Sequence, residues 1–340
     1  MPPRRPARSG TAGPSPTPTA RPRRLRRTPA LREWVAETDV ELRRLVYPVF
    51  VRAGGGAPEP IPSMPGVVRY PVRDLATLAR ELAGEGIRSV LLFGVGRRKD
   101  PEGRDAWAAD GVVPEAVRAV KQAAPGLVVA TDVCLCAYTS HGHCGVVRGG
   151  VVVNDVSCER LGRVAVAHAA AGADVVAPSA MMDGQVAELR RALDAAGHEA
   201  TAILAYSTKH ASSFYGPFRE AEGSTPSFGD RRSYQMDFRN AREALFEIER
   251  DVAEGADIVM VKPAITSLDL LARARRRFLL PLAAYQVSGE YAMLKAAAGA
   301  GVVDERAAVE ETLAAIRRAG ADLIVTYFAR DVARWAHEGR

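Results

Sequence analysis

The stretch EGADIVMVKP, residues 254–263, places a glycine and an acid directly before a continuous apolar run. Glycine adopts positive φ at low cost and commonly ends a helix, so a strand can begin immediately after it. The run IVMV shows no polar alternation, which is typical of a parallel strand buried on both faces. We therefore interpret this stretch as a helix end followed at once by a buried strand.

The same pattern recurs along the chain. AGAD at 171–174 and at 319–322 precedes an apolar run, and EGIRS at 85–89 resembles it. Eight runs rich in Val, Ile and Leu alternate with helical patterns, which favours a parallel sheet covered by helices. The predicted strands span residues 45–51, 89–95, 127–133, 174–178, 202–207, 257–263, 282–288 and 322–329.

The glycine-and-acid motif precedes the fourth, sixth and eighth predicted strands, and the similar EGIRS precedes the second. Eight strand–helix units, with a similar motif in every second unit, favour a closed (β/α)8 TIM barrel over an open doubly wound sheet. A doubly wound sheet would more often carry a glycine-rich loop after its first strand, and neither GxGxxG nor GxxxxGK[ST] occurs in the sequence. We therefore predict an α/β protein with a TIM-barrel fold.

Positive charge is concentrated at the N-terminus. The chain has a formal charge of +6, but residues 1–30 carry eight Arg and no acid, and the remainder has a net charge of −2. Residues 1–23 are rich in Arg, Pro, Ser and Thr and have little to bury, so we predict a disordered basic tail. A solvated extension is favoured, with a transit peptide or a nucleic-acid contact as alternatives.

Composition also bears on location. No apolar run reaches the roughly 18–20 residues that a membrane helix needs. Four cysteines, three of them crowded together, do not resemble a secreted disulfide framework. We expect a cytoplasmic protein that contacts neither a membrane nor nucleic acid.

Two long intervals separate consecutive strands, after the third and the fifth. Extra length after a barrel strand lies on the C-terminal face, where barrels place their chemistry. The second interval contains residues 209–236, which are rich in Gly, Ser, aromatic residues and Arg. We predict that this segment closes over a substrate as a lid.

Two of the five lysines lie at neighbouring strand ends, Lys209 after the fifth strand and Lys262 at the end of the sixth. Two nearby ammonium groups lower each other's pKa, and burial acts in the same direction. A neutral amine can form a Schiff base with a ketone, which Arg cannot do. A solvated surface role is the alternative, but two lysines at adjacent strand ends favour the Schiff-base interpretation.

The first long interval opens with DVCLCAYTSHGHCG, residues 132–145. Its three thiols offer metal ligands, and His141 or His143 could complete a closed structural zinc site. The position on the catalytic face favours a catalytic zinc with an open coordination position, and we expect neither histidine to be a ligand. A redox pair would favour C-x2-C near a thioredoxin-like unit, which is absent from the sequence. Cys158 lies outside this group.

Other polar residues accompany the strand ends. Asp132, Ser288 and Tyr327 lie near the ends of the third, seventh and eighth strands. Arg219 and Arg231 lie on the predicted lid and could clamp carboxylates through bidentate hydrogen bonds. Each could alternatively be a satisfied structural residue or a solvated loop charge.

These motifs together resemble the porphobilinogen synthase family, also called 5-aminolaevulinate dehydratase. The resemblance rests on DVCLCAYTSHGHCG, YSTKHASSFYGPFREA, MVKPA and YQVSGEYAM, and it runs from about residue 24 to the end. It implies a lyase that condenses two 5-aminolaevulinate molecules to porphobilinogen with loss of two waters, in tetrapyrrole (haem) biosynthesis.

The resemblance also implies roles for individual residues. Lys209 and Lys262 would each form a Schiff base with one substrate molecule. A catalytic zinc would act as a Lewis acid on the amine or on a leaving water. Its ligands would be Cys134, Cys136 and Cys144.

A set of substrate contacts is implied as well. Ser288 and Tyr327 would hold the carboxylate of one substrate, and Arg219 and Arg231 would hold that of the other. The remaining pocket residues would be Asp132, Ser179 and Tyr215.

The resemblance further implies regulation and assembly. Glu247 matches the family's ligand for an allosteric magnesium, although a surface Glu on a helix is the simpler interpretation. Family members typically form homo-octamers in which an N-terminal arm wraps a neighbour. Residues 24–43 would be this arm, and residues 44–340 the catalytic barrel.

Two positions depart from the family pattern. Ala137 stands where an acid is expected after the second cysteine, and Ala180 stands where Asp is expected. Both could alter metal affinity or loop packing.

Two alternatives to this function remain. A class I aldolase also uses a barrel-lysine imine, but it needs one lysine and no cysteine cluster. A zinc-dependent nucleic-acid-binding module would use the basic tail, yet positive charge is confined to that tail.

Overall fold

The computed structural model describes residues 20–338 and divides the chain into two units, residues 1–39 and 40–340. In the first unit the described residues form η1 (Pro22–Arg26) and α1 (Pro29–Trp34). Thr28 caps α1 by accepting a hydrogen bond from the N–H of Leu31. Of the predicted basic tail, residues 1–19 lie outside the described residues.

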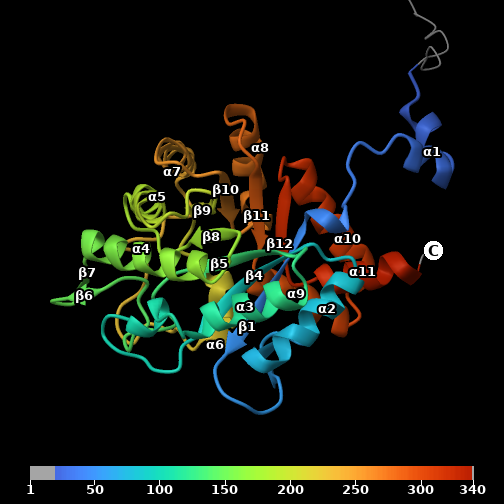
Figure 1. The fold of residues 1–340 in the computed structure, drawn as a ribbon. Helices are drawn as coiled ribbons and strands as arrows, with labels where there is room; N and C mark the ends of the chain where they lie inside the picture. The colour runs from blue at the N-terminus through green and yellow to red at the C-terminus, as the bar shows by residue number, and fades with distance from the viewer. Residues whose placement is uncertain (1–19, 339–340) are drawn as a thin grey trace, which may run out of the picture. The chain divides into compact units, whose positions relative to one another are not determined.

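The second unit contains a closed parallel barrel, with its strands at the centre and its helices around them (Figure 1). The chain order of the strands is also their order around the barrel, and β1 pairs with both β4 and β12, which closes the sheet. The predicted TIM barrel is confirmed, and every predicted run contributes one strand. The barrel strands are β1 (Leu45–Arg52), β4 (Ser89–Val95), β5 (Val128–Val133), β8 (Val175–Pro178), β9 (Ala202–Lys209), β10 (Ile258–Lys262), β11 (Leu282–Gln286) and β12 (Leu323–Thr326).

Helices follow each strand and cover the outside of the barrel (Figure 1). Among the described residues, no helix is both long enough and apolar enough to cross a membrane. The covering helices are α2 (Leu75–Gly84), α3 (Val112–Ala123), α4 (Asn154–Ala170), α5 (Gln185–Ala195), α7 (Ala241–Ala253), α8 (Leu268–Arg277), α10 (Glu305–Arg318) and α11 (Ala329–Glu338).

The remaining elements precede the first barrel strand or lie in the connections between strands and covering helices. They are η2 (Leu42–Arg44), β2 (Glu59–Pro60), β3 (Val68–Pro71), η3 (Val72–Asp74), η4 (Arg104–Trp107), β6 (Val147–Arg148), β7 (Val151–Val152), η5 (Ser213–Tyr215), α6 (Gly216–Glu222), η6 (Ile265–Ser267) and α9 (Ser288–Gly299). The pairs β2–β3 and β6–β7 are antiparallel and were not predicted, because two to four residues carry no periodic signal. The segment 209–236, predicted as a lid, contains η5 and α6.

The acid of the repeated motif joins an even-numbered barrel strand to the strand before it. Each aspartate accepts a hydrogen bond at 2.7–2.9 Å from one backbone N–H near the start of the preceding strand. Its own N–H donates to the carbonyl oxygen of that same residue. These two hydrogen bonds set the register between the two strands and explain why an acid follows the glycine of the repeated motif. The pairs are Asp174 with Val129, Asp257 with Ile203 and Asp322 with Leu282.

The glycine of the motif ends the preceding helix with positive φ, as predicted. Gly172 has φ +101°, and Gly320 has φ +120°. A Cβ added at Gly320 would lie 2.7 Å from the Cβ of Arg275, so only glycine fits there. The chain can therefore reverse into the next strand within a few residues, from Ala170 to Val175 and from Arg318 to Leu323.

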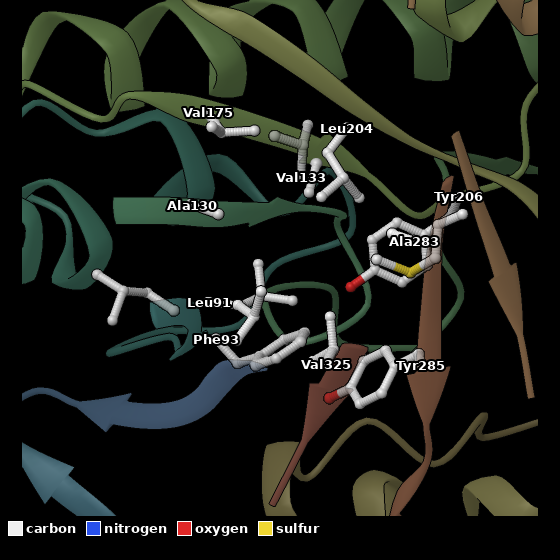
Figure 2. Packing of buried hydrophobic residues seen from close by; sticks show 14 of the residues in the cluster. Leu91, Phe93, Ala130, Val133, Val175, Leu204, Tyr206, Ala283, Tyr285 and Val325 are labelled. Atoms are coloured by element: carbon white, nitrogen blue, oxygen red, sulfur yellow. The ribbon is translucent and has the colours of Figure 1, made fainter. Parts of the chain in front are cut away.

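The barrel interior is filled by apolar and aromatic side chains from different strands, many of which Figure 2 shows. Below the mouth they form a layer of rings. The ring centroids of Phe93 and Tyr285 lie 6.3 Å apart, those of Tyr206 and Tyr285 6.4 Å, and those of Tyr285 and Tyr327 6.2 Å. Tyr285 lies next to the last residue of β11, and Tyr327 directly follows β12, so this layer lies at the carboxyl ends of the strands.

Candidate active site

The two predicted Schiff-base lysines end neighbouring strands and are paired in register, Lys209 on β9 and Lys262 on β10. Both are buried, with 6% and 3% of their surface exposed. The ammonium group of Lys209 donates to the carbonyl oxygen of Ser179. Burial lowers the pKa of Lys262 to about 7, and the positive charge of Lys209 acts in the same direction. A large share of Lys262 is therefore a neutral amine at neutral pH.

Aromatic rings surround the Lys262 amine. Its Nζ lies 4.2 Å from the ring centroid of Tyr285 and 5.2 Å from that of Tyr206. Figure 2 shows these two rings within the barrel. The rings of Tyr215 and Phe218 each lie 5.0 Å from Nζ and come from the lid segment. The cage removes water from the amine, which is the physical cause of its lowered pKa.

The lid segment is packed against the start of α9. Ser288 accepts a hydrogen bond from the N–H of Phe218 at 3.0 Å and donates to the carbonyl oxygen of Phe214 at 3.3 Å. A Cβ at Gly289 would lie 2.6 Å from that carbonyl oxygen, so glycine permits the close approach. The Tyr215 hydroxyl donates to the carbonyl oxygen of Lys262 at 3.4 Å. Ser288 and Tyr215 thus lie where the lid meets the barrel.

The other predicted pocket residues also lie at the strand ends. The hydroxyls of Tyr327 and Tyr285 are 3.0 Å apart. Asp132 is the last residue but one of β5, and its Oδ1 is buried without a protein hydrogen-bond partner. Loss of solvent raises the pKa of Asp132 to about 6, opposed by the positive charge of Lys209. Ser179 follows β8 directly, and its side chain acts to lower the pKa of Asp132.

Two arginines of the lid segment carry unpaired donors. Arg231 is buried and donates to the carbonyl oxygens of Gly142 and Ser224, at 2.9 and 2.6 Å. Arg219 is half-buried and donates to the carbonyl oxygen of Ser212 at 3.4 Å. The Nε atoms of both are buried without a protein partner. Buried donors without partners suit a polar ligand.

The three clustered cysteines meet after β5. Their Sγ atoms all lie within 4.8 Å of one another, and those of Cys134 and Cys136 are 3.3 Å apart. All are buried and none forms a disulfide. Hydrogen bonds from Cys134 and Cys136 hold the pKa of Cys144 well below its usual range, and the positive charges of Arg231 and Lys209 act the same way. The pKa values of Cys134 and Cys136 are instead raised well above their usual range, so the cluster offers a metal three convergent thiols, which would lose their protons on binding it.

The two histidines of the same loop are engaged elsewhere. The ring nitrogens of His143 contact the Tyr234 hydroxyl at 3.0 Å and the Phe228 carbonyl oxygen at 3.1 Å. His141 contacts the Pro101 carbonyl oxygen through Nε2, and its Nδ1 accepts from the N–H of His143. Both rings hold the loop together, so neither has a free nitrogen for a metal at the thiols.

Comparison with known proteins agrees with this geometry. The sequence pattern of the delta-aminolevulinic acid dehydratase family matches residues 19–335. The dehydratase of Synechococcus elongatus is 53% identical over 322 residues, covering 94% of this chain and 99% of that protein. The Escherichia coli dehydratase is 54% identical over 313 residues, covering 92% and 96%.

The chain belongs to the delta-aminolevulinic acid dehydratase family. A crystal structure of the Toxoplasma gondii dehydratase (porphobilinogen synthase), in complex with the reaction product porphobilinogen, superposes with a TM-score of 0.92. It is 46% identical, and the match covers 94% of this chain and 92% of that one. The predicted family and the predicted enzyme class, a lyase, are thereby confirmed.

This member of the dehydratase family carries one buried acid at the cysteine cluster that the sequence did not reveal. Glu222, the last residue of α6, is 2% exposed. The Cys136 thiol donates to its Oε2 at 3.5 Å. Burial raises the pKa of Glu222 to about 8, and the negative charge of Asp132 adds to the effect. Because 86 residues separate Glu222 from Cys136, no local motif could have indicated the contact.

The predicted allosteric ligand of the dehydratase family lies in a different place. Glu247 is half-buried on α7 and lines a cavity of about 430 Å³ together with Asp183, Glu243 and Asp251. Burial raises the pKa of Glu247, and the nearby Asp183 and Glu243 add to it. Excess negative charge of this kind would favour a cation.

The remaining positions singled out in the sequence have no polar role in the site. Ala137 and Ala180 are buried, with 3% and 0% exposed. Cys158 lies on α4 and donates to the Asp183 carbonyl oxygen at 3.4 Å, away from the three clustered thiols.

Proposed function

We propose that this chain condenses two 5-aminolaevulinate molecules into porphobilinogen with loss of two waters. The observation that carries the proposal is the pair of buried lysines in register, Lys209 and Lys262, beside three convergent thiols. Two amines can hold two ketones side by side, which replaces a bimolecular encounter by a positioned one. One lysine alone, as in an aldolase, would leave the second amine and the thiols without a role.

The lysines act as nucleophiles in this proposal. The neutral amine of Lys262 attacks the ketone carbon of one substrate, a C–N bond forms, and the ketone oxygen leaves as water. Lys209 forms the second imine in the same way and releases the second water. Both lysines return as free amines when the pyrrole forms, so two waters are the only by-products.

Other side chains bind and orient the substrates. Arg219 and Arg231 hold one carboxylate through their unpaired donors, because charge-assisted bonds to Arg are strong and directional. Ser288 and Tyr327 hold the other carboxylate. The pocket walls are Asp132, Ser179 and Tyr215, and the lid segment excludes water from the imines.

The thiols suit a zinc ion. Three buried Sγ atoms within 4.8 Å match the soft ligands that zinc prefers, and both nearby histidines are engaged with other partners. Cys134, Cys136 and Cys144 would hold it, and a bound zinc with an open position would supply Lewis acidity. The positive charges of Arg231 and Lys209 partly offset the negative charge of the thiolates.

Assembly and regulation belong to the same proposal. Residues 24–43 form an arm that packs on a neighbour in a cytoplasmic homo-octamer, residues 44–340 form the barrel, and Glu247 binds an activating magnesium. In support, Trp34 is 80% exposed and no residue of α1 is buried, so the arm presents apolar surface for a partner to cover. Light scattering should detect octamers, and a monomer at every magnesium concentration would contradict this assignment.

Trapping the imines tests the reaction. Borohydride added with 5-aminolaevulinate should reduce covalent adducts onto Lys209 and Lys262, which peptide mass spectrometry locates. The exposed Lys99 serves as an internal control and should carry no adduct. In parallel, a colour assay for pyrrole should be positive and should fail after chelation. An adduct on Lys209 alone would rule out the two-imine mechanism.

A further inference from the structure

One buried acid at the cysteine cluster has no part in the chemistry described above. The carboxyl of Glu222 is buried, and within residues 20–338 its side chain makes one hydrogen bond, which it accepts from the thiol of Cys136 at 3.5 Å. The positive charges of Arg231 and Lys209 act on the carboxyl, but neither side chain donates a hydrogen bond to it in the same residues. A buried carboxyl with a single weak partner costs stability, so its presence calls for a role at the site.

The surroundings hold the Glu222 end of α6 in place. Gly223 ends the helix with φ +58°, and its carbonyl oxygen accepts a hydrogen bond from Lys99. The carbonyl oxygens of Glu220 and Ala221 accept from the guanidinium of Arg69, at 2.8 and 2.5 Å. Two basic side chains thus tie down the last turn of α6, which aims Glu222 inward.

The other neighbours of Cys136 cannot replace this contact. Ala137, the next residue, has no polar group. The thiol of Cys134 lies 3.3 Å away, but it belongs to the same donor set. Glu222 is therefore the one carboxyl hydrogen-bonded to a clustered sulfur among the described residues.

We propose that Glu222 is a positioning residue of the metal centre. Without metal the Cys136 thiol donates to the Glu222 carboxyl; on metal binding the thiol proton passes to the carboxyl, which then donates to the thiolate and keeps the Cys136 sulfur toward Cys134 and Cys144. The inference rests on the proposed metal site. Glu222 is placed outside the coordination shell, because the group of donor atoms within 4.8 Å of one another contains the three sulfurs and no carboxylate oxygen. Side chains that orient a metal ligand typically change metal affinity by about 10–100-fold when removed.

Cobalt titration of the full-length chain tests this role without using activity. The protein is stripped with a chelator under reducing conditions, and Co²⁺ binding is followed by the thiolate-to-cobalt absorption band. Glu222→Leu should bind Co²⁺ about 10–100-fold more weakly than the unmodified chain. Glu222→Gln keeps a hydrogen-bonding group of the same shape and should bind close to the unmodified affinity. Glu220→Gln is the matched control, since Glu220 is exposed on the same helix and bonds to Ser63.

Thermal unfolding in chelator separates positioning from packing. Glu222→Leu removes a poorly paired buried carboxyl, so the metal-free protein should unfold at the same or a higher temperature. Cobalt affinity of Glu222→Leu equal to that of Glu220→Gln would overturn the proposal. So would an equal loss of affinity in Glu222→Gln and Glu222→Leu.

Failure of the proposed reaction would be detected by other measurements than failure of the role proposed for Glu222. Borohydride trapping and pyrrole formation report on the lysines, whereas cobalt binding reports on the thiols in the absence of substrate. If the unmodified chain bound no cobalt at its thiols, the metal site and the role of Glu222 would both be overturned, and the imine result would stand independently.

Discussion

The two ends of the barrel place ionisable side chains in opposite surroundings. Where the strands begin, Asp174 and Asp322 are half-buried and bond to backbone groups of the preceding strand. Where the strands end, Lys262 and Glu222 are buried among rings and thiols with few partners, and burial shifts their pKa values toward neutrality. The first arrangement stabilises the fold, while the second costs stability and supplies reactive groups.

The largest expected difference between the ends comes from replacing a lysine at each. Lys262→Met should reduce pyrrole formation by at least about 10⁴-fold, because the positioned nucleophile is lost. Lys121→Met, at the opposite end, removes an ion pair with Asp174 and should leave the rate per folded molecule unchanged. Steady-state kinetics on both variants checks this, and a Lys262→Met variant with near-normal turnover would refute the assignment.

Replacing Lys262 by Met should increase the stability of the fold although it lowers activity. The folded-state pKa of Lys262 is about 7, below the ordinary value of 10.5, so the fold disfavours its charged form. The resulting loss of stability is complete below about pH 7 and disappears as pH rises toward 10.5. Lys262→Met should therefore be more stable than the unmodified chain at pH 7, with a gap that narrows at pH 10. Denaturant unfolding at the two pH values measures this.

The pH dependence of the rate is the next largest effect. If neutral Lys262 is the nucleophile, kcat/KM should fall about tenfold per pH unit below about pH 7 and level off above it. A profile that stays flat down to pH 5 would mean that the amine of Lys262 does not limit the reaction. Measuring the same range with Lys121→Met controls for general effects of pH on the fold.

A smaller effect is expected where the strands begin. Asp322→Ala removes the acceptor for the N–H of Leu282 and the partner of Arg275, so the free energy of unfolding should fall by about 1–3 kcal/mol. The turnover of the folded fraction should not change. A drop in kcat without a drop in stability would show that the two ends are not separate in function.

The smallest effect concerns the glycine of the repeated motif. Gly172 has φ +101° with no heavy atom closer than 3.9 Å to an added Cβ, so Gly172→Ala tests backbone strain without a clash. We expect a loss of about 1 kcal/mol in the free energy of unfolding. An unchanged midpoint of denaturant unfolding would show that this conformation is not what ends the helix.

Much of the fold could be predicted because its signals are local. Each buried run is long enough to show that it lacks alternation, and the motif exemplified by EGAD at 254–257 marks where a helix stops and a strand begins. The short pairs β2–β3 and β6–β7 escaped prediction, since a strand of two residues has no measurable period. Residues 209–236 were predicted as a loop with a lid function, but helix α6 within it was not.

The candidate site also has features that the sequence predicted and features that it did not. The sequence by itself determined which residue types are present and that Lys209 and Lys262 would reach one mouth, because strand order in a barrel follows chain order. Only the tertiary structure decided that rings from β9, β11 and the lid enclose Lys262, that both histidines are occupied, and that Glu222 reaches Cys136. Burial and hydrogen-bond partners depend on which distant segments meet, and that is set by packing of the whole barrel rather than by local sequence.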